Sequence, residues 1–142
     1  MSDIHIVVLA AGKGSRMKSE LPKVLHSIGG LTLIERVLRT ASALFPASIT
    51  LVVGHGAAAV RQSLAKRTQL QFVTQDQQLG TGHALLQTRS LLEGRAGTVV
   101  LLSGDVPLLS ANSLKALLDT HHESRAAGTA AQIRRRDPFP GR

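Results

Sequence analysis

The sequence predicts an α/β protein built on a mostly parallel, Rossmann-like sheet with helices on both faces. Short apolar runs rich in β-branched residues alternate with segments in which apolar residues recur every three or four positions. This alternation is typical of β-α-β units, which form parallel sheets. Glycine-containing segments follow three of the apolar runs, at Gly12–Met17, Gly54–Gly56 and Gly104–Asp105. In open parallel sheets, ligands bind at the loops that follow the carboxyl ends of the strands.

Each element of this fold follows from a local pattern. The first apolar run, Ile4–Ala10, is nearly continuous and predicts a buried parallel strand. Helical spacing predicts a helix over Thr32–Phe45, which Pro46 ends. The other predicted elements are strands over Ser48–Val53, Leu70–Val73, Thr98–Ser103 and Gly128–Ile133, and helices over Ala57–Arg67, Gly80–Leu92 and from Ser110 or Asn112 to Leu118. We expect Thr98–Ser103 to be the most clearly buried strand of the second half.

Length and composition fit one globular domain. The chain has 142 residues, of which 43% are hydrophobic, so it can bury a core of its own. Cysteine is absent, which excludes disulfides, thiolate catalysis and cysteine-based zinc sites. The chain has three Phe and no Tyr or Trp. This scarcity argues against nucleic acid as a partner, because single-stranded nucleic acid is usually stacked on aromatic rings.

The net charge of +8 indicates anionic partners. One group of basic residues surrounds the first glycine segment, and a second group lies at the other end of the chain, where a solvated tail is the simpler interpretation. The two groups are Lys13, Arg16, Lys18 and Lys23, and Arg134, Arg135, Arg136 and Arg142. The first residues lack the basic region of a secretory signal, and the run after them is too short to span a membrane. We therefore expect a cytoplasmic protein with no membrane partner.

The segment Leu9–Met17 places two glycines and several basic residues directly after the first strand. It fits neither the dinucleotide-binding fingerprint, which needs a third glycine, nor the P-loop, which needs Gly-Lys-Ser/Thr after four residues. Small residues still let a backbone approach a base or a phosphate, and Arg16 and Lys23 supply donors for phosphate oxygens. A plain turn between strand and helix, with surface lysines, explains the spacing equally well.

Three ordered segments nevertheless resemble one family. Leu9–Met17 followed by Leu21-Pro22-Lys23 resembles the sugar-phosphate nucleotidyltransferases. Gln78–Ala84 and Gly104–Leu108 narrow the resemblance to the uridyltransferase domain of the bacterial bifunctional N-acetylglucosamine-1-phosphate uridyltransferases/glucosamine-1-phosphate acetyltransferases. The resemblance covers the chain to about Leu118. It implies the nucleotide-diphospho-sugar transferase fold, and uridylyl transfer from UTP to N-acetylglucosamine-1-phosphate, which yields UDP-N-acetylglucosamine and pyrophosphate for cell-wall synthesis.

The resemblance also implies a role for each matching position. Arg16 and Lys23 would be catalytic, holding the triphosphate while pyrophosphate leaves. Asp105 would bind Mg²⁺, the expected cofactor. The implied substrate-binding residues are Leu9, Ala10, Ala11, Gly12, Lys23, Gln75, Gly80, Thr81, Ser103, Gly104, Asp105 and Gly141. Without the family, Asp105 would be interpreted as a turn or helix-capping residue. Histidines such as His55 and His83 are predicted to be structural or to lie at the surface.

The chain also departs from the family pattern. It is shorter than a complete nucleotidyltransferase domain, so we expect residues 1–142 to form the N-terminal part of a single domain. The acetyltransferase β-helix, through which family members form homotrimers, is absent from the sequence, as is the family's second metal ligand. We therefore expect weak activity, or none, from this chain by itself.

Two other functions remain open at this stage. The first keeps the fold and changes the nucleotide, as in cytidylyl- or guanylyltransferases of the molybdenum-cofactor type. The second is a non-catalytic regulatory or nucleic-acid-binding module, which the net charge of +8 and the terminal arginines would favour. Gln75 and the segment Gly80–His83 favour uridine within the resemblance.

Overall fold

A four-stranded parallel sheet forms the centre of residues 1–111, the first of two compact units of the chain. The computed structural model describes residues 3–12, 21–106 and 109–130. The strands are β1 (Ile4–Ala10), β4 (Ser48–Val53), β5 (Leu70–Thr74) and β6 (Thr98–Ser103), in the order β5-β4-β1-β6. The chain moves from β1 outward to β5 and then returns to the other side of β1. Such a reversal of strand order is where open α/β sheets bind ligands.

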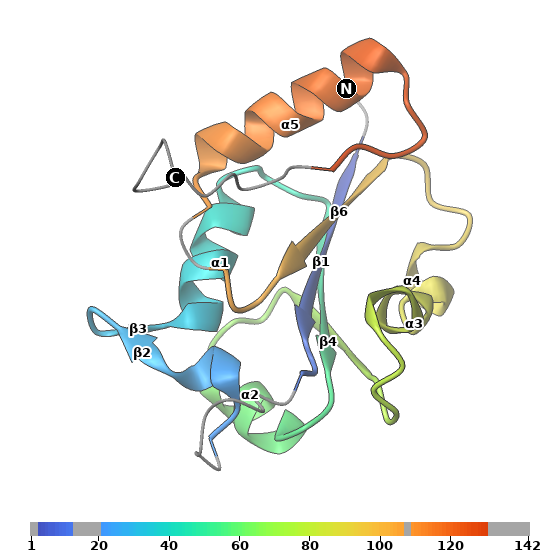
Figure 1. Ribbon diagram of the computed structural model, residues 1–142. Helices are drawn as coiled ribbons and strands as arrows, with labels where there is room; N and C mark the ends of the chain where they lie inside the picture. Colours follow the sequence, from blue (N-terminus) through green and yellow to red (C-terminus); the bar gives the residue numbers. More distant parts are fainter. Residues whose placement is uncertain (1–2, 13–20, 107–108, 131–142) are drawn as a thin grey trace, which may run out of the picture. The chain divides into compact units, whose positions relative to one another are not determined.

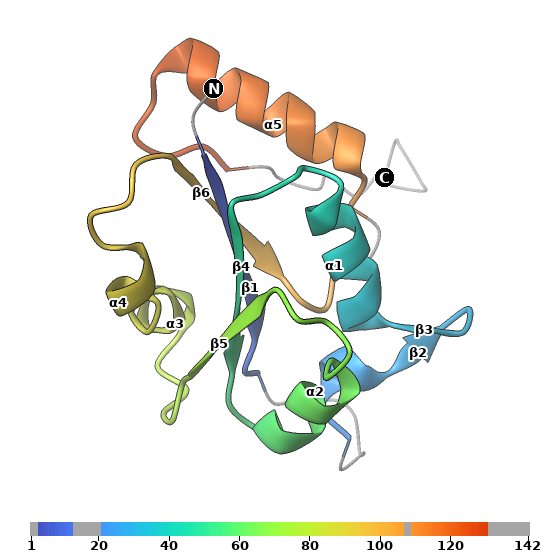
Figure 2. The same ribbon diagram turned by 180° about the vertical axis from the view of Figure 1, so that it is seen from behind.

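Helices cover both faces of the sheet. Helices α1 (Leu33–Ser42) and α2 (Ala57–Ser63) lie on one face, and α3 (Thr81–Leu86) and α4 (Arg89–Leu92) lie on the other (Figures 1 and 2). The change of face accompanies the reversal of strand order, as right-handed crossovers require. The predicted α/β class, with a parallel sheet between two helical layers, is confirmed.

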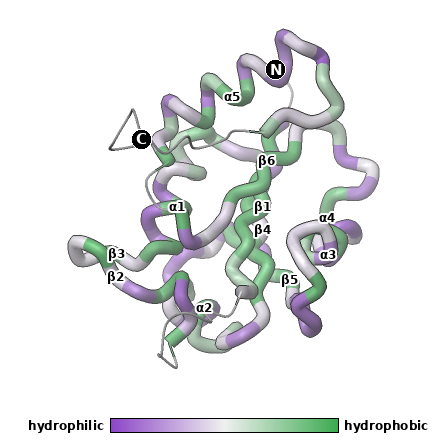
Figure 3. Tube along the Cα trace, viewed as in Figure 1, coloured by the Kyte–Doolittle hydropathy of each residue, from purple (hydrophilic) through white to green (hydrophobic). Residues whose placement is uncertain are grey.

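The core consists of aliphatic side chains on both faces of the two central strands. Figure 3 shows hydrophobic residues concentrated along these strands. On the face covered by α3, Val7 and Val52 pack with Ala11 and Ala84. The side chains that alternate with these in β1 and β4 are also buried, namely Ile6, Val8, Leu51 and Val53. Burial of both faces explains why β1 is a nearly continuous apolar run.

Helix α1 shows how the sequence sets an element boundary. Thr32 lies immediately before the helix, and its hydroxyl accepts a hydrogen bond from the Glu35 amide at 3.2 Å. This bond satisfies one of the amide groups that a helix start leaves unpaired. The buried side chains of α1 recur at helical spacing, and they are Leu33, Ile34, Val37, Leu38 and Ala41. The predicted helix over Thr32–Phe45 is therefore present, and it ends at Ser42.

The segment between β1 and α1 contains structure that we did not predict. A 3-10 helix, η1 (Lys23–Leu25), precedes a short hairpin of β2 (Ser27–Ile28) and β3 (Leu31–Thr32). Gly29 and Gly30 join the two strands with φ of 61° and 83°, values that suit the tight turn of a two-residue hairpin. Gly56, at φ 67°, packs so closely on Pro22 that a Cβ there would collide with the proline ring. This contact holds the start of η1 against the loop after β4.

The other elements agree with the prediction to different degrees. β1, β4 and β6 have the predicted bounds, whereas α2 ends at Ser63 instead of Arg67. The single helix predicted over Gly80–Leu92 is divided into α3 and α4. β6 is less buried than predicted: it is an edge strand, with Val99 and Leu101 45% and 39% exposed. No strand begins at Gly128 within the described residues, and the rest of that predicted strand lies outside them.

Residues 112–142 are the second compact unit. Helix α5 (Ala111–Ser124) accounts for most of its described part. This helix extends six residues beyond the predicted end at Leu118, although no apolar repeat continues there. Within the part of the chain that the structure describes, no helix is both long and apolar enough to cross a membrane.

Candidate functional site

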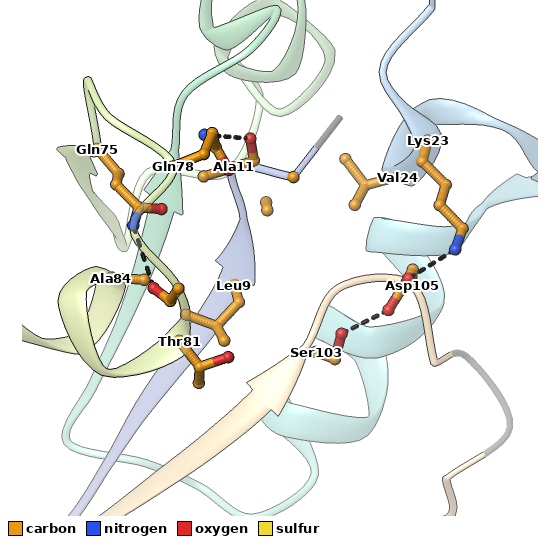
Figure 4. Close-up of a pocket in the computed structure, with 13 residues that line it drawn as sticks. Leu9, Ala11, Lys23, Val24, Gln75, Gln78, Thr81, Ala84, Ser103 and Asp105 are labelled. Atoms are coloured by element: carbon orange, nitrogen blue, oxygen red, sulfur yellow. Dashed lines mark hydrogen bonds and ion pairs between the residues drawn. The ribbon is translucent and has the colours of Figure 1, made fainter. Parts of the chain in front are cut away.

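A cavity of about 290 Å³ opens at the carboxyl ends of β1, β5 and β6 (Figure 4). All of its lining residues belong to the first unit of the chain. They come from the end of β1, from η1, from the segment between β5 and α3, from α3 itself, and from the end of β6. The lining residues are Leu9, Ala10, Ala11, Gly12, Lys23, Val24, Gln75, Gln78, Gly80, Thr81, Ala84, Ser103 and Asp105.

One side of the cavity is neutral and held by side-chain amides. We call it the amide side, consisting of Ala11, Gln75, Gln78 and Gly80. Gln75 is 3% exposed, and its backbone amide extends the strand pairing by donating to the Val53 carbonyl at 2.8 Å. The Gln75 Nε2 group donates to the Gly80 carbonyl at 3.2 Å, and Gln78 Nε2 donates to the Ala11 carbonyl at 2.8 Å. The Gln78 bond ties the loop after β1 to the loop after β5, whereas the Gln75 bond lies within the loop after β5.

Gly54 makes this arrangement possible. A Cβ at Gly54 would lie 2.9 Å from the Gln75 carbonyl oxygen, 3.0 Å from Gln78 Nε2 and 3.1 Å from the Ala11 Cβ. The two glutamines and Ala11 therefore converge on a position where only glycine fits without a shift of its neighbours. The glycine segment predicted after the second strand thus supports the cavity from behind, and it is absent from the lining.

The opposite side of the cavity is charged. We call it the charged side, consisting of Lys23, Ser103 and Asp105. Lys23 Nζ lies 2.8 Å from Asp105 Oδ2, and the Ser103 hydroxyl donates to Asp105 Oδ1. The side chains of Lys23 and Asp105 are 43% and 32% exposed, so water reaches both partners. Figure 4 shows this side facing the amide side across the cavity.

The electrostatics of Asp105 follow from these contacts. The hydrogen bond from Lys23 lowers the pKa of the Asp105 carboxyl, and the bond from Ser103 lowers it further. Partial burial acts in the opposite direction but does not outweigh them. Asp105 is therefore ionised at neutral pH. Its carboxylate oxygens are hard donors of the kind that bind divalent cations such as Mg²⁺.

Most of the predicted site residues lie around this single cavity. Ten of them line it: Leu9, Ala10, Ala11, Gly12, Lys23, Gln75, Gly80, Thr81, Ser103 and Asp105. Gly104 does not, because a Cβ there would point to the Leu9 carbonyl oxygen, Val24 and Ile34 at 2.8 to 3.2 Å. Arg16 and Gly141 lie outside the described residues.

Three lining residues were not predicted, namely Val24, Gln78 and Ala84. Gln78 and Ala84 lie within the motif Gln78–Ala84 that carried the family resemblance, so their place in the sequence was a usable signal. No sequence signal pointed to Val24, because a valine at this position is expected to be an ordinary core residue. Within the described residues, no group of three or more His, Cys, Asp and Glu side chains is placed to hold a metal ion. A metal here would take Asp105 as its acidic ligand.

Known proteins with similar sequences place the chain in a family. Residues 6–140 match the sequence profile of MobA-like NTP transferase domains. The bifunctional protein GlmU of Streptococcus pyogenes serotype M12 is 44% identical over 135 residues, which are 95% of this chain and 32% of that protein. The chain therefore spans about a third of the length of this relative. The similarity confirms the resemblance that the three sequence motifs carried.

Solved structures show the same fold. Rv0371c of Mycobacterium tuberculosis matches with a TM-score of 0.73 and 28% identity, over 84% of this chain and 60% of its own. A structure of that protein in complex with manganese matches with a TM-score of 0.69. The UDP-glucose pyrophosphorylase of Acinetobacter baumannii matches with a TM-score of 0.72 over 89% of this chain and 54% of its own. Its identity is 22%, so this likeness bears on the fold alone.

Proposed function

Because the chain belongs to the family of MobA-like NTP transferase domains, we propose that it transfers the uridylyl group of UTP to N-acetylglucosamine-1-phosphate. The products would be UDP-N-acetylglucosamine and pyrophosphate, a step in the supply of cell-wall precursors. One observation carries the proposal: a single cavity has a neutral amide side suited to a base and a charged side suited to phosphates and a metal.

The base would bind at the amide side. The Gln75 Nε2 group is occupied by the Gly80 carbonyl, which leaves the amide oxygen of Gln75 to accept a hydrogen bond. Uracil carries an N–H group at ring position 3 that can donate this bond, whereas cytosine carries an acceptor there. The backbones of Ala11 and Gly12, and of Gly80 and Thr81, would complete the base pocket. A Cβ at Gly12 or Gly80 would find nothing within 4 Å, so both positions are open to a ligand.

The reaction would occur at the charged side. An oxygen of the sugar phosphate attacks the α-phosphorus of UTP, and the bond from that phosphorus to the pyrophosphate oxygen breaks. The reactants and the leaving group are all anions, so positioning and charge neutralisation are the main tasks of the protein. Lys23 would neutralise phosphate charge from its place on η1. We assign the same task to Arg16 from the sequence, because it lies outside the described residues.

Asp105 would hold the metal that we propose as the cofactor, Mg²⁺. The site fits this ion, because Asp105 is ionised, partly open to water and placed at the rim of the cavity. A magnesium ion that keeps several waters needs only one or two protein carboxylates. When bound, such an ion stabilises charge on phosphate oxygens. Ser103 would orient the carboxylate through its hydroxyl.

Other parts of the proposed reaction rest on the sequence resemblance. We propose that Leu9, Ala10, Gly104 and Gly141 contribute to the substrate site, with Gly104 acting through close packing beneath it. The choice of acceptor sugar and the assembly into trimers are properties expected of a full-length relative, of which this chain spans about a third. We propose them only for a longer protein that carries this chain.

The decisive experiment measures pyrophosphate release by a protein that carries this chain, with Mg²⁺ and N-acetylglucosamine-1-phosphate. We expect turnover with UTP to exceed turnover with CTP by a wide margin. GTP is the informative competitor, because guanine also has a ring N–H that the Gln75 oxygen could accept. Turnover with GTP alone would replace uridylyl with guanylyl transfer, and turnover with CTP alone would overturn the assignment of the amide side.

A further inference from the structure

His83, at the third position of α3, lies directly behind Gln75. Its Nδ1 atom is 2.9 Å from Gln75 Nε2, the same nitrogen that lies 3.2 Å from the Gly80 carbonyl oxygen. The residue is absent from the lining of the cavity. The side-chain contact that links His83 to the lining is the one with Gln75.

The chemistry of the atoms shows which of them donates and which accepts in each of these contacts. A carbonyl oxygen only accepts hydrogen bonds, so the Gln75 atom facing Gly80 must be the NH₂ group. One proton of that group goes to Gly80, and the other points to His83 Nδ1. The ring nitrogen must therefore accept, which makes His83 a neutral imidazole with its proton on Nε2.

The remaining contact of the ring is weaker. Gln87 Nε2 donates to the His83 carbonyl at 3.1 Å and lies 3.3 Å from the ring Nε2. The two ring contacts require opposite tautomers, because the Gln87 NH₂ group is a donor and could bond the ring Nε2 only if that nitrogen accepted. The contact at Nδ1 is shorter, 2.9 Å against 3.3 Å, so the bond to Gln75 decides the tautomer and Gln87 keeps its bond to the His83 carbonyl.

A reversed Gln75 amide has no comparable set of partners. Its oxygen would then face the Gly80 carbonyl oxygen, and it would have a donor only if the His83 proton moved to Nδ1. The Gly80 carbonyl would keep its bond from the Ala84 amide but lose the one from Gln75. Leaving a buried polar group unpaired costs about 1–3 kcal/mol for each group. His83 and Gly80 together therefore hold the Gln75 amide in one orientation, with its oxygen directed into the cavity (Figure 4).

We propose that His83 is a positioning residue that fixes the hydrogen-bond polarity of Gln75 and thereby the choice of base. A fixed acceptor selects a base with a ring N–H donor, such as uracil, and rejects cytosine, which offers a second acceptor. Without the Nδ1 acceptor, only the Gly80 carbonyl holds the Gln75 NH₂ group. The reversed amide, which presents NH₂ to the cavity where cytosine can accept, then becomes less costly. The inference rests on the proposed function, because it takes UTP as the substrate.

Two substitutions separate this role from simple packing. His83→Leu keeps the branched shape of the side chain but removes the acceptor, whereas His83→Asn keeps an acceptor near the position of Nδ1. The readout is the ratio of kcat/KM for UTP to that for CTP. We expect His83→Leu to lower the ratio at least about tenfold, the effect of one buried hydrogen bond, mainly through the KM values. We expect His83→Asn to keep the ratio within about threefold of wild type, since the hydrogen bond survives.

An equal decrease of the UTP-to-CTP ratio of kcat/KM in both variants would overturn the proposal. An unchanged ratio in His83→Leu would also overturn it. A third measurement needs no substitution: the ¹⁵N NMR shifts of the His83 ring in the wild-type protein. We expect a neutral ring with an unprotonated Nδ1, and a protonated Nδ1 would overturn the proposal even if a variant failed to fold. Failure of the proposed function looks different, because the wild-type protein would then not prefer UTP at all.

Discussion

The two sides of the cavity are built from different interactions. On the amide side, neutral groups are held by hydrogen bonds, and Gln75 is 3% exposed. On the charged side, Lys23 and Asp105 form an ion pair whose side chains are 43% and 32% exposed. The first arrangement fixes each donor and acceptor in place. The second holds two charges that satisfy each other and can exchange partners through water.

This difference matches what each side must do in the proposed reaction. Discrimination between bases depends on hydrogen bonds of fixed polarity, because a mismatched base leaves buried polar groups unpaired. Transfer of a nucleotidyl group depends on charges placed where negative charge develops on the phosphates. The Lys23–Asp105 pair keeps both charged groups at the cavity before a ligand arrives. A triphosphate can then take the lysine, and a cation can take the carboxylate.

The largest effect is expected from a substitution that disrupts the charged side alone. Asp105→Asn removes the carboxylate that we assign to the metal but keeps the shape of the side chain. We expect turnover with UTP to fall by about a hundredfold to a thousandfold, and the dependence of the rate on Mg²⁺ concentration to weaken. The preference for UTP over CTP should not change, because the amide side is intact. Steady-state kinetics across Mg²⁺ concentrations measure all three quantities.

Asp119→Asn is the matched control, because Asp119 is an exposed carboxylate on α5 and is not among the residues that line the cavity. It should leave turnover and metal dependence unchanged. An unaltered metal requirement in Asp105→Asn would remove Asp105 from the metal site. A changed base preference would show that the two sides of the cavity do not act separately.

A smaller effect is expected when the amide side is disturbed from behind. Gly54→Ala places a methyl group between Gln75, Gln78 and Ala11, at 2.9 to 3.1 Å from their nearest atoms. Overpacking of this kind costs about 1–3 kcal/mol of unfolding free energy. We expect urea unfolding to show this loss and nucleotide binding to weaken, because the two glutamines must move.

Gly12→Ala is the control for the effect of Gly54→Ala on the free energy of unfolding. A Cβ there meets nothing within 4 Å, and Gly12 is not among the glycines with positive φ. Its unfolding free energy should stay the same or rise by up to about 1 kcal/mol, since alanine reduces the freedom of the unfolded chain. Equal stability of the two variants would mean that Gly54 is not tightly packed in solution.

The sequence predicted the sheet better than the helices. The bounds of β1 and β4 follow from continuous apolar runs, because burial on both faces leaves no polar position inside either strand. β6 has the same kind of sequence, yet Val99 and Leu101 are partly exposed. A run of apolar residues cannot show whether a strand lies at the centre or the edge of a sheet. The end of α2 at Ser63 could not be predicted either, since Lys66 and Arg67 are residues that suit the last turn of a helix.

For the site, too, the sequence predicted some features and missed others. Family motifs indicated both Gln75 and Asp105, and the structure brings them to one cavity. The motifs gave no hint of the Gln78 bond to the Ala11 carbonyl, which joins residues 67 positions apart. They also left His83 as a structural residue, because its contact with Gln75 depends on how α3 begins after Gly80. Pairings between side chains of different loops depend on a geometry that only the folded chain defines.

The smallest expected effect concerns the pH dependence of the Lys23–Asp105 pair. Because the pKa of Asp105 is lowered in the folded state from its usual value of 3.8, the folded protein favours the ionised carboxylate. This contribution to stability is fully present above that value and is lost as pH falls through the lower pKa of the folded state. Since both side chains are substantially exposed, solvent screening limits the contribution to less than about 1 kcal/mol.

The measurement compares unfolding free energies of wild type and Asp105→Asn from neutral pH down to about pH 2, at low and high salt. The difference between them should be largest at neutral pH and low salt, and it should shrink as the medium becomes acidic. Asp119→Asn, measured alongside, corrects for the general loss of one carboxylate. A difference that persisted in acid would mean that Asp105 stabilises the fold through the Ser103 hydrogen bond and not through its charge, so the charged side would resemble the amide side after all.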